Sequence, residues 1–371
     1  MTTFLFSNLK VLLLIAISIF SIGILITIHE LGHFFFAKLF GVRTPTFSIG
    51  MGPALYSKKI GDTEFKISAI PFGGYLEIAG NAEIGQGDQQ DAHATDAGSF
   101  QVKPYWQKFL ILIGGILFNL LAAFIVCVGL FYAGMPKTQF LGGDTVRPII
   151  SRVLDDSIAQ KLQLQIGDEF ISINNMSPLN LTTLLSALKQ NAEKTITFQI
   201  KRADQTLNFT ATLGKAGLLG FEPKADFFPR YGLIAATQKA GAAIITISKA
   251  VIDVVITLFT KQGMKNLASP LMFVSAFVTN AKQGAALLLF LLVFFSVNLA
   301  ILNLIPLPVV DGGQLVFITI EAIIGRQIPE KIRYGIHVAT WILIMGLTVY
   351  LVVKDSIFLF WPKIKALLGK L

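Results

Sequence analysis

Long uncharged apolar runs, separated by polar segments, dominate the hydrophobic pattern of the chain. Four of these runs are long enough for a helix that crosses a hydrocarbon core of about 30 Å, which takes about 20 residues. They cover residues 11–28, 109–136, 283–310 and 334–353. We therefore expect a polytopic α-helical membrane protein with four transmembrane helices.

Residues 240–260 form a further apolar stretch, but Lys249 and Asp253 lie one helical turn apart in its middle. Ionisable groups in the centre of a bilayer are costly. A fifth crossing would also place His33, which follows the first run, and Asp311, which follows the third, on opposite sides of the membrane. We expect both to contribute to one site. We therefore expect residues 215–282 to be a linker whose amphipathic helix lies in the membrane interface.

Residues 139–214 are polar and alternate in hydrophobicity, so they predict a small α+β domain inserted between two membrane halves, residues 1–138 and 283–371. The pattern predicts strands at 147–153, 169–173, 195–201 and 206–213, and helices at 157–162 and 182–190. A separate short β element is expected near the membrane at residues 65–69, and its free edge could pair with an extended segment.

The composition agrees with this pattern. The 371 residues are 53% hydrophobic and only 14% charged, which excludes a soluble globular protein. The basic residues behind the net charge of +9 are scattered, which favours attraction to anionic lipid headgroups over nucleic-acid binding. The single cysteine, Cys127, excludes a disulfide framework and a thiolate zinc site.

The candidate metal-binding and catalytic residues His29, Glu30 and His33 lie at the end of the first apolar run. Positions i and i+4 share one face of a helix, so the two imidazoles can hold one Zn²⁺. The carboxylate between them can then activate the bound water. Two satisfied helix histidines beside a chance glutamate are the alternative interpretation of so short a match.

A third protein ligand is needed, because catalytic zinc takes three such ligands and an open position. We expect Asp311 to supply it. Prolines at 306 and 308 must break the preceding helix, and glycines at 312 and 313 allow a tight turn that points Asp311 towards the first run. An aspartate that ends an apolar helix only for solvation is the alternative.

With these motifs the chain resembles the site-2 protease family of intramembrane zinc metalloproteases, in particular its bacterial PDZ-containing members of the regulator of sigma-E protease type. The resemblance spans nearly the whole length, in residues 29–33, 47–53, 70–75, 114–119 and 303–313. Residues 157–174 resemble the PDZ signature, and such domains capture peptides at a sheet edge. The chain departs from the family pattern in three places. Val310 stands where the family usually has Leu, and Gln314 stands where it often has His. The chain also has a single PDZ-like domain, where this type usually has two.

The resemblance implies regulated intramembrane proteolysis: cleavage of single-span substrates, of the anti-sigma factor or remnant signal peptide type, after prior extracytoplasmic trimming. Glu30 would take the proton of the water and return it to the leaving amine. Substrate segments would contact the membrane β element and the third run, at Phe65, Ile67, Gly73, Gly74, Asn298 and Asn303. Hydrogen bonding between helices remains the alternative role of the two asparagines.

Basic residues in the loop after the first run favour a cytoplasmic position for that loop, although lysines in the C-terminal tail favour the reverse. We expect a multi-pass protein of the bacterial inner membrane, with the zinc site towards the cytoplasm. The PDZ-like domain would then be extracytoplasmic and bind a peptide or a substrate segment.

Two other functions remain open. One is a catalytically silent membrane PDZ scaffold or adaptor, which would have no reason to keep Glu30. The other is a membrane zinc protease with a downstream glutamate as third ligand, for which Glu321 is the candidate. His93 and His337 are lone histidines, and we expect neither to bind zinc.

Overall fold

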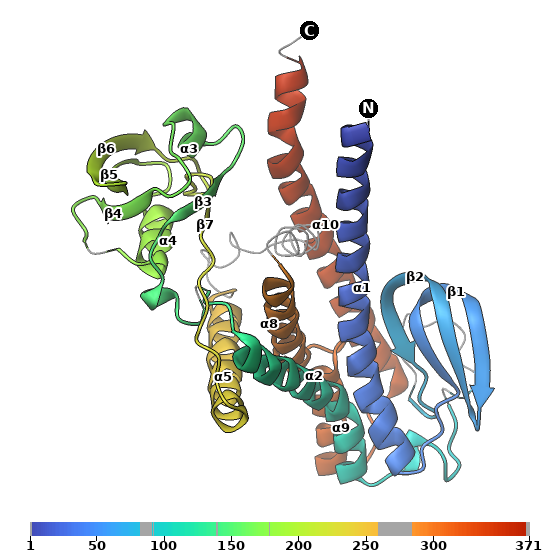
Figure 1. Ribbon diagram of the computed structural model, residues 1–371. Helices are drawn as coiled ribbons and strands as arrows, with labels where there is room; N and C mark the ends of the chain where they lie inside the picture. The colour runs from blue at the N-terminus through green and yellow to red at the C-terminus, as the bar shows by residue number, and fades with distance from the viewer. Residues whose placement is uncertain are drawn as a thin grey trace. The chain divides into compact units, whose positions relative to one another are not determined.

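The computed structural model describes residues 2–81, 91, 93–138, 140–177, 179–258 and 284–368. The chain divides into two compact units (Figure 1). The membrane unit comprises Met1–Cys127 and Ser248–Leu371, and the small unit comprises Val128–Ile247.

Within the described residues, five helices are long and apolar enough to cross a membrane. Four of these segments overlap the expected spans, and they are Ile19–Leu39, Tyr105–Ala133, Ala285–Asn303 and Lys331–Lys354. The fifth, Leu233–Thr257, overlaps the stretch of residues 240–260 that was expected in the interface. The polytopic helical class is thus confirmed, whereas length and composition admit one span more than the four expected.

Helices α1 (Thr2–Leu39) and α2 (Tyr105–Ala133) approach each other through glycines. A Cβ on Gly32 would lie 2.1 Å from the carbonyl oxygen of Gly114, and a Cβ on Gly114 would lie 2.6 Å from that of Gly32. Only glycines permit backbones to pack this closely. Because α1 continues to Leu39, His29 and His33 face α2 from within a continuous helix rather than from its end.

Strands β1 (Thr46–Ile60) and β2 (Thr63–Leu76) form a sheet beside α1 (Figure 1). The free edge expected at residues 65–69 is not there at Phe65 and Ile67, because β1 folds along both sides of this part of β2. Phe65 pairs with both Phe47 and Lys58, and Ile67 pairs with both Ile49 and Tyr56. Residues 50–59 carry two glycines, a proline and two adjacent lysines, so this part of β1 lacks the alternation that predicts a strand.

Helix α8 (Ala285–Asn303) ends before Pro306, as predicted, and α9 (Asp311–Ile324) begins at Asp311. The role expected for the glycines was wrong in one respect. They occupy the first turn of α9, where a Cβ on Gly312 would lie 2.4 Å from the Ile305 carbonyl oxygen and one on Gly313 would lie 2.1 Å from that of Leu307. They therefore allow the preceding loop to pack against the helix. Helix α10 (Glu330–Leu368) follows.

The small unit confirms the expected strands and helices to within a few residues. Its elements are β3 (Ile150–Val153), α3 (Ile158–Lys161), β4 (Glu169–Ile173), α4 (Leu181–Gln190), β5 (Thr195–Arg202) and β6 (Gln205–Thr212). A further strand, β7 (Phe221–Pro223), pairs with β3, so the fold continues past residue 214. Helix α5 (Leu233–Leu258) follows.

Candidate metal centre

Three side chains of the membrane unit converge on one point. The Nε2 atoms of His29 and His33 lie 3.1 Å apart on one face of α1, as the i and i+4 spacing requires. Asp311, the first residue of α9, places its Oδ2 3.0 Å from His29 Nε2 and 3.5 Å from His33 Nε2. In the part of the chain that the structure describes, these residues make the one group of three His, Cys, Asp or Glu side chains that could hold a metal ion.

The donor set fits zinc. Ligand atoms about 2.0–2.2 Å from a tetrahedral Zn²⁺ lie roughly 3.3–3.5 Å from one another, close to the three separations here. Both histidines are buried, and Asp311 Oδ2 is a buried oxygen with no hydrogen-bond partner. A buried carboxylate oxygen costs free energy unless a cation or donor satisfies it. Two imidazole nitrogens and one carboxylate oxygen leave the fourth position for water or substrate.

Helix α2 supports this arrangement from behind. His33 Nδ1 donates to the backbone carbonyl of Ile111 over 2.7 Å, which leaves the Nε2 lone pair for a metal. Gly115 lies against both rings, because a Cβ there would come within 2.5 Å of His33 Nε2 and 2.6 Å of His29 Cε1. A glycine at this position therefore leaves room for the two imidazoles.

Glu30 lies between the two histidines in sequence and is half-buried. Its carboxylate is close enough to His33 to interact with it electrostatically. The structure thus places a carboxylate next to the ligand face of α1, where a general base would be needed.

The expected substrate-binding residues fall in different places. The Asn303 amide nitrogen lies 3.4 Å from His29 Nε2, so this side chain belongs to the metal centre. The Asn298 amide instead donates to the Phe294 carbonyl of its own helix over 2.8 Å. Phe65 packs against Phe34 in a hydrophobic cluster. Ile67 is 49% exposed, whereas Gly73 is buried and Gly74 is half-buried.

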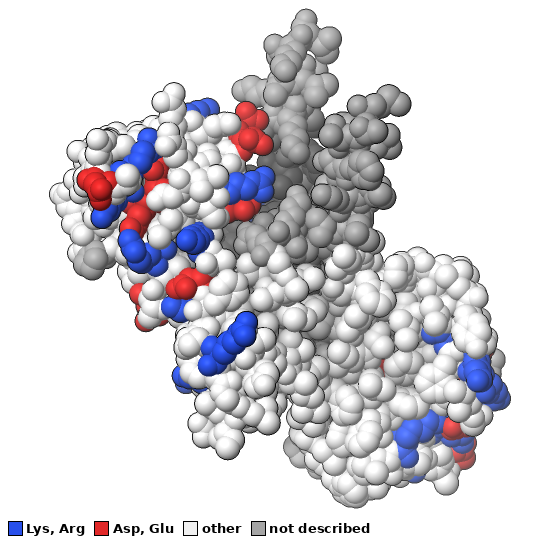
Figure 2. Space-filling view, in the orientation of Figure 1, with Lys and Arg blue, Asp and Glu red and all other residues white. Residues whose placement is uncertain are grey.

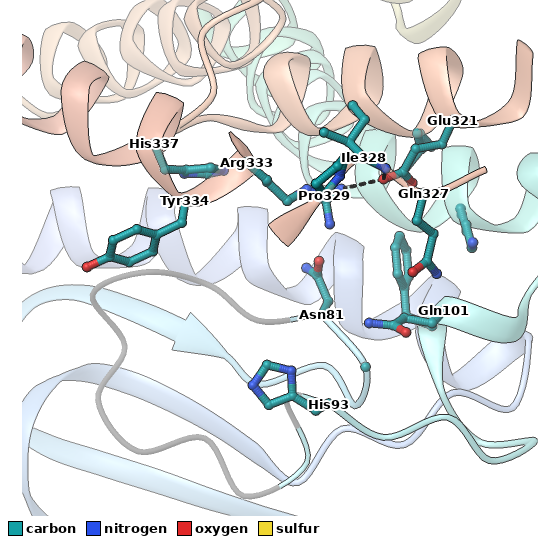
Figure 3. A pocket seen from close by; sticks show the side chains of 14 residues that line it. Asn81, His93, Gln101, Glu321, Gln327, Ile328, Pro329, Arg333, Tyr334 and His337 are labelled. Atoms are coloured by element: carbon teal, nitrogen blue, oxygen red, sulfur yellow. Dashed lines mark hydrogen bonds and ion pairs between the residues drawn. The ribbon is translucent and has the colours of Figure 1, made fainter. Parts of the chain in front are cut away.

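Residues weighed as other ligands line a separate cavity of about 410 Å³ in the membrane unit, shown in Figure 3. Glu321 accepts a hydrogen bond from the backbone nitrogen of Ile328 over 3.1 Å and lies 3.8 Å from the Arg333 guanidinium. His337 lies 2.9 Å from the Gln314 amide, and His93 lies on the opposite side of the cavity. Glu321 and His337 therefore hold the corner between α9 and α10.

Two supporting residues were not expected from the sequence. Gln314, one turn after Asp311, donates to the Pro308 carbonyl over 3.2 Å and so pins the loop before the third ligand. Asn119 contacts His29 from α2. Asn119 lies in residues 114–119, one of the family-like runs, but a run alone does not say which side chain contacts a ligand.

A buried His-His-Asp trio on apolar helices defines a class of protein, the membrane-embedded zinc metalloproteases. Residues 17–347 match the model of Peptidase family M50. The chain belongs to this family, the site-2 proteases, and is a zinc-dependent peptidase.

Similar proteins occur in several bacteria. The chain is 28% identical over 354 residues to a protein of Clostridium perfringens, and the alignment covers 93% of this chain and 98% of the relative. A Synechocystis protein is 28% identical over 354 residues, covering 91% and 92%, respectively. A Rickettsia conorii protein is 29% identical over 336 residues, covering 85% and 90%. All three carry the name "Putative zinc metalloprotease".

Proposed function

We propose that this enzyme hydrolyses peptide bonds within the transmembrane segments of single-span proteins. The observation that supports this most directly is the position of the ligands. His29 and His33 lie within Ile19–Leu39, a helix long and apolar enough to cross a membrane, with the helix continuing beyond them. A peptide bond that reaches this centre must therefore enter the apolar part of the molecule.

The chain's own residues divide the chemistry. When bound, Zn²⁺ supplies a Lewis acid that polarises the scissile carbonyl and acidifies a water. His29, His33 and Asp311 hold the ion. The Glu30 carboxylate accepts a proton from the attacking water and then delivers it to the departing amine, so that one amide bond is exchanged for a carboxylate and an amine.

The substrate must be locally extended, because the carbonyl of a helical peptide bond is already hydrogen-bonded within its helix. In β2, the segment Gly73–Leu76 pairs with β1 on one side, through Gly74, Tyr75 and Leu76. This segment lies near α1, since a Cβ on Gly74 would be 3.8 Å from Ile26 Cγ2. We assign substrate pairing to this edge, with Asn303 contacting the opened backbone at the metal centre. Asn298, which bonds within its own helix, has the weaker case for such a contact.

The remaining expectations complete the proposal. The enzyme acts in the inner membrane of a bacterium, with its zinc centre towards the cytoplasm and the small unit outside. Its substrates are of the anti-sigma factor or remnant signal peptide type, already trimmed outside. Under this proposal α5 lies in the interface and the protein has four crossings.

The PDZ-like part of the small unit binds a peptide or substrate segment and excludes substrates that keep a large outer domain. Deletion of residues 142–213 removes none of the proposed catalytic residues. The deleted enzyme should therefore hold zinc and cleave both a short substrate and a bulky one. Continued rejection of the bulky substrate by a folded, zinc-containing enzyme would contradict the size filter.

The test of the proposed chemistry compares wild type with Glu30→Gln on a model single-span substrate, with bound zinc measured in parallel. Glutamine keeps the shape but cannot accept the proton, so cleavage should fall by about 10²- to 10⁴-fold or more while zinc is retained. Glu321→Gln is the matched control, and it should keep both. Normal cleavage by Glu30→Gln would remove Glu30 from the mechanism, and zinc loss in Glu321→Gln would favour the rival ligand.

A further inference from the structure

Asn119 is an asparagine with no exposed surface, placed on α2 one turn after Gly115. Its amide nitrogen lies 3.1 Å from His29 Nδ1. Its side-chain oxygen is buried and has no hydrogen-bond partner. A buried amide oxygen left unpaired costs about 1–3 kcal/mol, so this arrangement of the amide is unfavourable.

The same arrangement conflicts with metal binding. A neutral imidazole carries its proton on one nitrogen only. If the Asn119 amide nitrogen donated to Nδ1, the proton would stand on Nε2, the atom that faces His33 and Asp311. A protonated Nε2 has no lone pair to offer a metal ion.

Rotation of the amide by a half-turn gives the oxygen a partner and leaves Nε2 of His29 free for a metal ion. The exchange fits the same space, because the oxygen and the nitrogen are nearly equal in size. The oxygen then lies at the position that is 3.1 Å from Nδ1, where it accepts the ring proton. We infer that the Asn119 side-chain oxygen accepts a hydrogen bond from His29 Nδ1–H and thereby holds His29 in the tautomer that binds zinc. Asn119 is a positioning residue, and its role rests on the metal centre proposed above.

Two neighbouring contacts agree with this role. His33 has the same arrangement, since its Nδ1 faces the Ile111 carbonyl at 2.7 Å. The backbone carbonyl of Gly115 also accepts a hydrogen bond from His29. Ile111, Gly115 and Asn119 recur every four residues and so share one face of α2, which presents acceptors to the two ligand rings.

The backbone at Asn119 is anchored separately. The Ser296 hydroxyl of α8 donates to the Asn119 carbonyl over 2.8 Å. This contact fixes the position of α2 without touching either histidine, so it offers a control that disturbs the same site by packing alone.

The experiment measures the zinc affinity of the full-length protein in detergent by competition with a chelator, for wild type, Asn119→Leu, Asn119→Asp and Ser296→Ala. Orienting partners of this kind typically contribute 10- to 100-fold to metal affinity. Asn119→Leu should therefore weaken zinc binding by about that factor. Asn119→Asp can accept but not donate, so it should bind as tightly as wild type or more tightly. Ser296→Ala should stay within a few-fold of wild type.

Each contrary result overturns the inference. Wild-type affinity in Asn119→Leu would show that His29 needs no such partner. Equal weakening in Asn119→Asp and Asn119→Leu would show that the amide donates or acts through shape, and equal weakening in Ser296→Ala would assign the effect to packing. Failure of the proposed metal centre gives a different signature, because His33→Ala would then keep its zinc.

Discussion

The small unit and the contact between α1 and α2 in the membrane unit achieve close packing by opposite means. The small unit is held by side chains, with Leu184, Ile196 and Ile200 fully buried in its core. The contact between α1 and α2 in the membrane unit instead depends on two glycines, Gly32 and Gly114, which have no side chain to keep the backbones apart. In water, burial of apolar side chains drives folding, whereas apolar helices in lipid gain from close backbone contact and from polar groups that meet across the interface.

Polar groups differ between the units in the same way. Figure 2 shows charges of both signs on the surface of the small unit, where Arg147 pairs with Glu169 and Arg152 with Glu222. In the apolar helices of the membrane unit, the buried polar residues His29, His33 and Asn119 gather at the metal centre. Polar side chains thus serve solubility on the surface of the small unit and the site within the apolar helices of the membrane unit.

The largest expected effect is loss of the metal. Wild type should hold about one Zn²⁺ per chain, because three protein ligands are sufficient for a catalytic site. His33→Ala leaves two ligands and should lose nearly all bound zinc, as measured by metal analysis of purified protein. Fold integrity is checked by the helix content from circular dichroism, which should be unchanged. Undiminished zinc in this variant would refute the site.

The glycine contact supplies the next test. Gly115→Ala places a Cβ within 2.5 Å of His33 Nε2, so the rings must shift and zinc affinity should fall by about 10-fold or more. Gly129→Ala, on the same helix, is the control, because a Cβ there meets nothing within 4 Å. If both variants bind zinc as wild type does, steric room at α2 does not govern the centre.

A third variant tests the small unit alone. Leu184 is 0% exposed, and Leu184→Ala should destabilise this unit by about 2–5 kcal/mol through lost burial and a cavity. Hydrogen exchange of peptides from β5 measures the change, and zinc affinity should be unaffected. Leu218→Ala, at a position that is 60% exposed, should change stability by less than about 0.5 kcal/mol. Zinc loss in Leu184→Ala would show that the two units are not energetically separate.

The smallest effect concerns a surface ion pair in the small unit. The hydrogen bond from Lys137 lowers the pKa of Asp226 below its ordinary value. A lowered pKa in the folded state stabilises the protein above the unfolded pKa of about 3.9, and this contribution is lost as the pH falls through the folded pKa. Lys137→Gln should therefore cost at most about 1 kcal/mol at pH 7 and less at pH 3, as measured by urea unfolding. An equal cost at both pH values would assign the effect to packing.

Sequence reasoning worked best where local pattern and environment agree. Alternating residues in 195–201 and 206–213 predicted β5 and β6, because each strand has one face in the core and one in water. It missed β1, whose residues 51–60 are exposed on both faces and so show no alternation. It also placed a free edge at Phe65, because no local pattern shows that the preceding strand, β1, folds along both sides of β2.

The sequence by itself determined the membrane class, the zinc motif on one helix face, and the helix break before Asp311, because these follow from local hydrophobicity, the 3.6-residue period and the geometry of proline. Tertiary structure alone decided that Asp311 lies 3.0 Å from His29 and that Asn119 lies behind the same ring. Uniformly apolar helices carry no pattern that tells which face meets which neighbour. That choice is made by glycines and buried polar atoms, whose partners stand tens or hundreds of residues away along the chain.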